Sequence, residues 1–108
     1  MTDIDILRRI AGVIDARRSA DANSSYVAKL FSQGHDAILK KVAEESAETL
    51  LAAKDGDKLH LVRETADLWF HSLVMLSYHG LGPDQVLDEL SRREGTSGLD
   101  EKESRQVP

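Results

Sequence analysis

The chain reads Glu44-Glu45-Ser46-Ala47-Glu48 and, after fifteen intervening residues, Glu64-Thr65-Ala66-Asp67. Both stretches lie in segments with helical periodicity, so each places its carboxylates on one side of a helix. Carboxylates that converge from two neighbouring helices repel one another unless a cation lies between them. The pattern therefore predicts two long helices that share a site for a hard divalent cation, above all Mg²⁺, which usually brings a phosphate substrate with it.

Glycines divide the rest of the chain into helix-sized segments. We expect helices over about residues 2–18, 25–33, 36–54, 58–79 and 83–93. Ser24 or Ser25, Asp36 and Asp57 are the expected N-caps, and Pro83 suits the first turn of the last helix. The predicted fold is all-α, a helical bundle in which the two long helices are antiparallel neighbours.

The domain organisation follows from length and pattern. We expect one domain over residues 1–94 and a polar, mobile tail over residues 95–108, which contains Gly and Ser but no apolar periodicity. A chain of 108 residues builds only a modest core. The helix that carries Glu64 is apolar in more directions than its neighbours can cover, so we expect a homodimer to complete the bundle.

Composition excludes several classes of protein. The net charge of −5 argues against a general nucleic-acid binder. The chain has no cysteine, which excludes disulfides and thiolate metal sites. The longest apolar run, residues 73–76, is too short to span a bilayer. The acidic N-terminus does not look like a signal peptide, so we expect a cytoplasmic protein.

The two acidic clusters differ in what they indicate. The glutamates of residues 44–48 alone also fit the solvated face of any amphipathic helix. Glu64, Asp67 and His71 instead form a narrow polar stripe with apolar residues on both sides. Carboxylates buried there cost several kcal/mol each unless they are paired or bound to a metal. We favour a metal site, and the alternative is an internal salt bridge to Lys40, Lys41 or Arg63.

The ligand types narrow the choice of metal. Structural zinc normally uses cysteine, and a di-iron bundle uses Glu-x-x-His on two helices. Here the spacings are Glu45-x-x-Glu48 and Glu64-x-x-Asp67. An all-oxygen ligand set favours Mg²⁺, with Mn²⁺ as a substitute.

The sequence Glu-Glu-x-x-Glu followed by Glu-x-x-Asp resembles the all-α nucleoside-triphosphate pyrophosphohydrolase superfamily, with its MazG-like fold. Within it, the chain is similar to the phosphoribosyl-ATP pyrophosphohydrolase family from about Ile4 to the tail. The closer match is carried by Ser25-Tyr26-x-x-x-Leu30, Lys40-Lys41-Val42-x-Glu44-Glu45 and Glu64-x-Ala66-Asp67-Leu68-x-x-His71. Ala43 is a small departure where relatives often have glycine.

The resemblance implies roles for nine residues. The expected Mg²⁺ ligands are Glu44, Glu45, Glu48, Glu64 and Asp67. Glu44, Glu45 and Glu48 are also the candidate catalytic residues. One of them would serve as the base, and Glu44 or Glu45 is the first choice. The candidate substrate-binding residues are Lys40, Lys41, Tyr26 and His71. Core or surface roles remain the alternatives for Tyr26, His71 and Lys40.

The implied reaction is Mg²⁺-dependent hydrolysis of phosphoribosyl-ATP to phosphoribosyl-AMP and pyrophosphate, the second step of histidine biosynthesis. A partner copy of the chain and a cyclohydrolase of the same pathway are the implied protein partners. Two alternatives remain open from the residues. One is a house-cleaning pyrophosphohydrolase for free nucleoside triphosphates, and the other is a non-catalytic helical dimerisation module.

Overall fold

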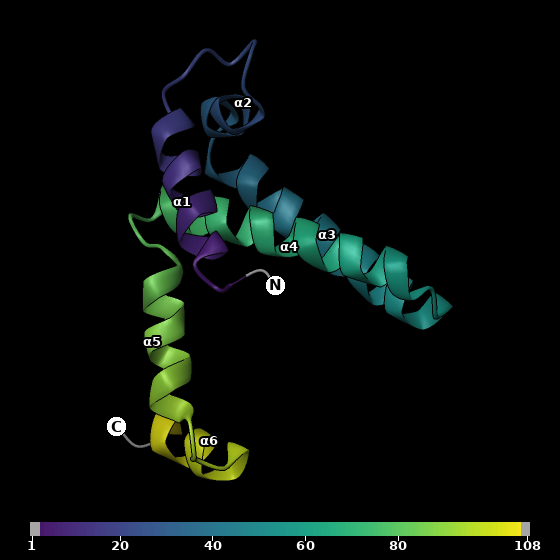
Figure 1. The fold of residues 1–108 in the computed structure, drawn as a ribbon, viewed down its shortest axis with the longest axis vertical. Helices are drawn as coiled ribbons and strands as arrows, with labels where there is room; N and C mark the ends of the chain where they lie inside the picture. The colour runs from purple at the N-terminus through teal and green to yellow at the C-terminus, as the bar shows by residue number, and fades with distance from the viewer. Residues whose placement is uncertain (1–2, 107–108) are drawn as a thin grey trace.

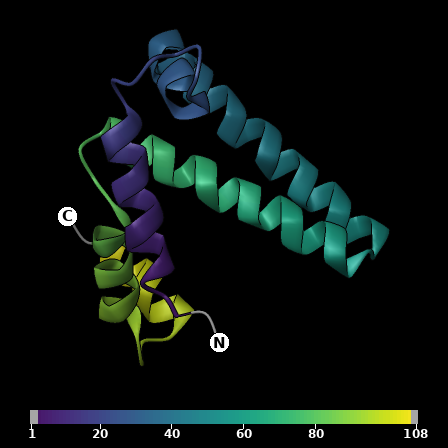
Figure 2. The ribbon, with the colours of Figure 1, turned by 45° about the horizontal axis from the view of Figure 1, so that its top comes forward.

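The computed structural model describes residues 3–106, and these residues form six α-helices. The helices are α1 (Ile6–Arg17), α2 (Tyr26–Gln33), α3 (His35–Asp55), α4 (Lys58–Tyr78), α5 (Pro83–Arg93) and α6 (Gly98–Gln106). The long α3 and α4 lie side by side as an antiparallel hairpin (Figure 1). Both views show this hairpin as an arm that extends away from α5 and α6 (Figure 2). The predicted all-α fold with two long antiparallel helices is confirmed.

The hairpin turn follows from local chemistry at two residues. Gly56 ends α3 with a φ of 79°, a left-handed conformation that favours glycine. Asp57 then caps α4, since its side chain accepts a hydrogen bond of 3.1 Å from the His60 amide. This turn sets α3 antiparallel to α4 and so brings the two acidic stretches to opposite sides of one interface.

The other helix ends agree with the sequence in part. Ser25 is the N-cap of α2, and its hydroxyl accepts from the Ala28 amide at 3.2 Å. The prediction that Asp36 caps α3 is wrong. Gly34 occupies the cap position, and Asp36 lies in the first turn, where its charge suits the positive end of the helix dipole. The first helix begins at Ile6 instead of residue 2, which lies outside the described residues.

The apolar core lies where α1 and α2 pack on the start of α3 and the end of α4. Its buried members are Ile14, Val27, Leu30, Ile38, Leu73 and Val74. The far end of the hairpin is different, because Leu51 and Val62 remain 64% and 65% exposed. Within one chain, α4 is therefore largely buried only over its C-terminal half.

Helix α6 was not predicted. Its first turn is held by the Ser97 hydroxyl, which accepts from the Asp100 amide at 3.1 Å. The buried Glu101 carboxylate binds Arg92 of α5 at 2.6 Å and Arg105 at 3.3 Å. Ion pairs thus attach this helix to α5, and it lacks the apolar stripe from which a helix is usually predicted. The division at residue 94 into a domain and a mobile tail stays a prediction.

No helix within residues 3–106 combines the length and apolar character needed to cross a membrane.

Candidate metal and phosphate site

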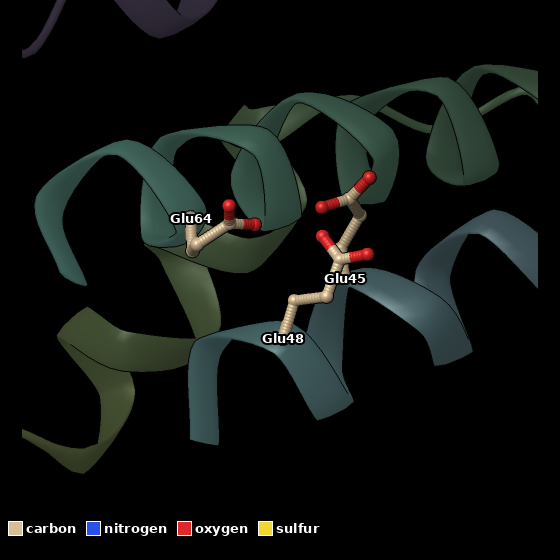
Figure 3. A group of neighbouring side chains, drawn as sticks. All are labelled: Glu45, Glu48 and Glu64. Atoms are coloured by element: carbon tan, nitrogen blue, oxygen red, sulfur yellow. The ribbon is translucent and has the colours of Figure 1, made fainter. Parts of the chain in front are cut away.

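Three glutamates from the two long helices meet between them. Glu45 and Glu48 are one turn apart on α3, and Glu64 reaches across from α4 (Figure 3). One carboxylate oxygen of each lies within 4.8 Å of those of the other two. Glu45 is buried, Glu64 is half-buried and Glu48 is exposed, so the group opens to solvent on the Glu48 side.

Two oxygen atoms of this group lack partners. Oε2 of Glu45 and Oε2 of Glu64 are buried, and neither has a hydrogen-bond partner among the described residues. The other Glu64 oxygen has the His60 ring nitrogen at 3.2 Å. An unpaired buried carboxylate oxygen is costly. A divalent cation with oxygen ligands would offset the cost of burying such carboxylates, so the residues present fit such an ion.

The pKa of Glu45 is consistent with a cation site. Burial raises the pKa of Glu45 most strongly, and the charges of Glu48, Asp67 and Glu64 raise it further against the opposing effect of Lys41. The carboxylates thus repel one another in the absence of a cation. A bound cation reverses this effect, since it favours the ionised form of every ligand.

The two remaining predicted ligands lie outside the group of three. Asp67 is exposed on α4, and its charge acts on Glu45. Glu44 turns toward two lysines instead, with its oxygens 4.0 Å from the Lys40 ammonium and 3.7 Å from that of Lys41. The Lys41 ammonium also lies 3.7 Å from Glu45. Salt bridges to Lys40 and Lys41 therefore exist, but they leave the unpaired oxygens of Glu45 and Glu64 without a partner.

Tyr26 and His71 form a pair beside the carboxylates. The Tyr26 hydroxyl lies 2.7 Å from Nε2 of His71, and Nδ1 of His71 lies 2.9 Å from the Asp67 carbonyl oxygen. A carbonyl oxygen only accepts, so Nδ1 carries the proton and Nε2 accepts from Tyr26. His71 is buried, and its Nδ1 is 4.0 Å from a Glu45 oxygen. Both nitrogens are thus engaged by the protein in this structure.

A polar cleft of about 370 Å³ adjoins the carboxylates on the α2 side. It is lined by Tyr26, Lys29, Leu30, Gln33, Ala37, Lys40, Lys41 and Glu44. Of these residues, Tyr26, Lys40, Lys41 and Glu44 are predicted site residues, whereas Lys29 and Gln33 were not predicted. Tyr26, Lys29 and Gln33 are spaced i, i+3 and i+7, so one face of α2 carries all three. That spacing could have predicted that the three residues share a helix face, although it could not show which helix that face packs against.

The comparisons with known proteins agree with this geometry. The family model described as phosphoribosyl-ATP pyrophosphohydrolase matches residues 7–94. A protein of Chromobacterium violaceum is 68% identical over 101 residues, which cover 94% of this chain and 94% of the relative. One of Nitrosospira multiformis is 63% identical over 107 residues, covering 99% and 88%. One of Neisseria gonorrhoeae is 55% identical over 100 residues, covering 93% and 94%. All three relatives are named phosphoribosyl-ATP pyrophosphatase.

The family match, together with an all-α hairpin whose glutamates meet between its long helices, places the protein in the class of helical pyrophosphohydrolases. Within that class, the chain belongs to the phosphoribosyl-ATP pyrophosphohydrolase family. The protein is thus an enzyme, a hydrolase, as the resemblance implied.

Proposed function

We propose that the protein hydrolyses phosphoribosyl-ATP to phosphoribosyl-AMP and pyrophosphate, the second step of histidine biosynthesis. The observation that carries the proposal is the pair of buried, unpaired oxygens of Glu45 and Glu64 within a group of three carboxylates. Family membership supports the choice of substrate. The reaction balances with one water, whose oxygen bonds to phosphorus as the bond to the pyrophosphate oxygen breaks.

Mg²⁺ is the proposed cofactor, with Mn²⁺ as a substitute, held by Glu45, Glu48 and Glu64 with Asp67 nearby. Bound there, it would neutralise the triphosphate and make a water more acidic. Glu48 is the exposed member of the three, so the attacking water can reach it and transfer its proton to a Glu48 oxygen. Glu44 stays with the lysines, where it limits their net charge.

Lys41 connects the carboxylates to the lysine-lined cleft. Burial lowers its pKa, but the charges of Tyr26, Glu45 and Glu44 outweigh that effect, and the net direction is upward. The ammonium therefore stays charged at neutral pH. Its place 3.7 Å from Glu45 suits it to meet a phosphate oxygen as the triphosphate enters.

We also propose a homodimer in which a second copy covers the exposed apolar residues at the far end of the α3–α4 hairpin. Leu50, Leu51, Leu59 and Val62 are all at least 60% exposed. Several large apolar side chains exposed at one end of a hairpin are typical of an interface. A cyclohydrolase that receives the product is the further proposed partner, and the cytoplasm is the proposed location.

The decisive experiment measures pyrophosphate release from phosphoribosyl-ATP with Mg²⁺ and with EDTA, beside ATP and dCTP. We expect metal-dependent release from phosphoribosyl-ATP and little from the plain nucleotides. Release from ATP or dCTP instead would move the protein to the house-cleaning enzymes. Absence of release from all three would contradict the proposed function.

A further inference from the structure

The cleft beside the carboxylates concentrates positive charge in an acidic protein. The chain carries a net charge of −5, yet three of its six lysines line this one cleft against a single glutamate. Lys29 comes from α2, whereas Lys40 and Lys41 come from α3. Two helices thus present ammonium groups to the same cleft, and this arrangement favours the binding of an anion.

Only part of this charge is neutralised within the protein. Glu44 contacts Lys40 and Lys41, and Lys41 also contacts Glu45. Lys29 has no ion pair with any residue in the 3–106 range. The Gln33 side chain, one turn beyond Lys29 on α2, adds an amide donor to the same wall. The α2 side of the cleft therefore has free donors for a ligand.

The cleft is also displaced from the three glutamates along α3. Lys40 lies five residues before Glu45 and eight before Glu48, which corresponds to about 8 Å and 12 Å along the helix axis. The α2 wall of the cleft, with Lys29 and Gln33, is the part farther from the glutamates and is available to a second anionic group of the substrate. Phosphoribosyl-ATP carries anionic groups at two ends, a triphosphate and a ribose 5-phosphate, with the planar base between them. ATP has only the first.

We propose that Lys29 and Lys40, with Gln33, bind the ribose 5-phosphate group of the substrate. This phosphomonoester subsite would let the enzyme distinguish phosphoribosyl-ATP from free nucleoside triphosphates, because only the former has an anion at that end. In this arrangement Lys41 contacts the triphosphate, and Lys29 contacts the ribose 5-phosphate. The inference rests on the proposed function, since it concerns how the same substrate is held.

The test compares Lys29→Gln and Lys40→Gln with Lys54→Gln, a matched loss of one positive charge at the far end of α3. Charge-assisted hydrogen bonds to phosphate are among the stronger polar contacts. We expect each cleft variant to raise KM for phosphoribosyl-ATP roughly tenfold or more, while kcat stays within about twofold, as for an interaction made equally in the ground and transition states. Lys54→Gln should leave both constants unchanged, and Lys29→Arg should restore much of the affinity. Cleft variants that behave like Lys54→Gln would overturn the proposal.

A second measurement needs no turnover. Ribose 5-phosphate and pyrophosphate are titrated separately into the protein in EDTA, with amide chemical shifts as the readout. We expect saturable binding of ribose 5-phosphate with shifts centred on α2 and the first turns of α3, lost in Lys29→Gln. If the cleft binds pyrophosphate more tightly than ribose 5-phosphate, the assignment is wrong and the cleft binds the triphosphate instead. If the wild-type protein fails to hydrolyse phosphoribosyl-ATP, the proposed function fails, yet this titration still decides whether the cleft binds a phosphomonoester.

Discussion

Glu45 on α3 and Glu64 on α4 each hold one buried oxygen without a hydrogen-bond partner, and oxygens of the two residues lie within 4.8 Å of each other. Two buried, incompletely paired carboxylates that approach from different helices destabilise the metal-free protein. The arrangement persists because the surrounding helices fix both backbones. The stability of the protein should therefore depend on divalent cations.

Glu64→Gln tests this dependence by removing one charge with little change of shape. In EDTA we expect the variant to melt at a higher temperature than the wild type, because the repulsion with Glu45 is relieved. Mg²⁺ at about 100 times its Kd should raise the unfolding free energy of the wild type by about 2.7 kcal/mol. The variant should lose most of this gain, together with roughly 100-fold in kcat/KM.

Glu103→Gln is the matched control, since Glu103 is exposed on α6, away from the α3–α4 hairpin. Its melting temperature should respond to Mg²⁺ as that of the wild type does. An equal Mg²⁺ response in the Glu64 and Glu103 variants would contradict the metal site.

The pH dependence of stability should show the raised pKa of Glu45. Because burial and the neighbouring carboxylates raise this pKa, the folded protein binds the proton more tightly than the unfolded chain does. The stabilising contribution is therefore complete below the ordinary value of 4.5 and is lost as the pH rises through the folded pKa. Mg²⁺ should oppose this loss, since it binds the ionised carboxylates.

Urea unfolding across this pH range measures the effect. The difference between wild type and Glu45→Gln in EDTA isolates Glu45 from the other carboxylates, which titrate in both proteins. We expect the wild type to lose stability relative to the variant as the pH rises. Parallel curves for the two proteins would show that Glu45 has no raised pKa.

The parts of the structure that the sequence predicted are those fixed by local chemistry. Gly56 and Asp57 specify the hairpin turn through a left-handed glycine and an N-cap, and both signals lie within four residues of the turn. Once the turn is known, helical spacing alone brings the 44–48 and 64–67 stretches face to face. The neighbourhood of Glu45 and Glu64 was thus accessible to sequence reasoning.

The parts of the structure that the sequence did not predict depend on tertiary contacts. Lys29 lines the cleft only because α2 packs across the start of α3, and no spacing within α2 specifies that partner. Helix α6 has a single large apolar residue, Leu99, which is 78% exposed, so it shows no apolar periodicity. Its attachment through Glu101 to Arg92 requires the position of α5.

Tyr26→Phe should separate the role of the hydroxyl from that of the ring. The change removes the only described donor to Nε2 of His71, which is buried, and leaves the packing of the ring on Phe70 intact. We expect a loss of about 1 kcal/mol in unfolding free energy, typical of one net hydrogen bond. The tautomer of His71 should also be less fixed, which is measurable from the His71 ring resonances. Unchanged ring resonances would show that the pair does not fix the tautomer.

Glu101 should hold α6 against α5. The carboxylate is buried between Arg92 and Arg105, so Glu101→Ala removes the shared partner of both. We expect faster amide hydrogen exchange over residues 98–106, with the exchange of α3 and α4 unchanged. Glu103→Ala, on the exposed side of the same helix, serves as the control. Equal exchange in the two variants would mean that the ion pairs do not hold the helix.

Val62→Glu tests the proposed dimer. Val62 is 65% exposed, near Leu59 on α4, so a charge there costs a single chain little. In a dimer that buries this face, the same charge lies against apolar side chains and costs several kcal/mol. Sedimentation at micromolar concentration should therefore show a dimer for the wild type and a monomer for the variant, while helical circular dichroism stays unchanged. Arg63→Gln changes the neighbouring exposed residue by the same one unit of net charge and so controls for charge alone. A wild-type monomer, or a variant dimer as stable as that of the control, would exclude this face as the interface.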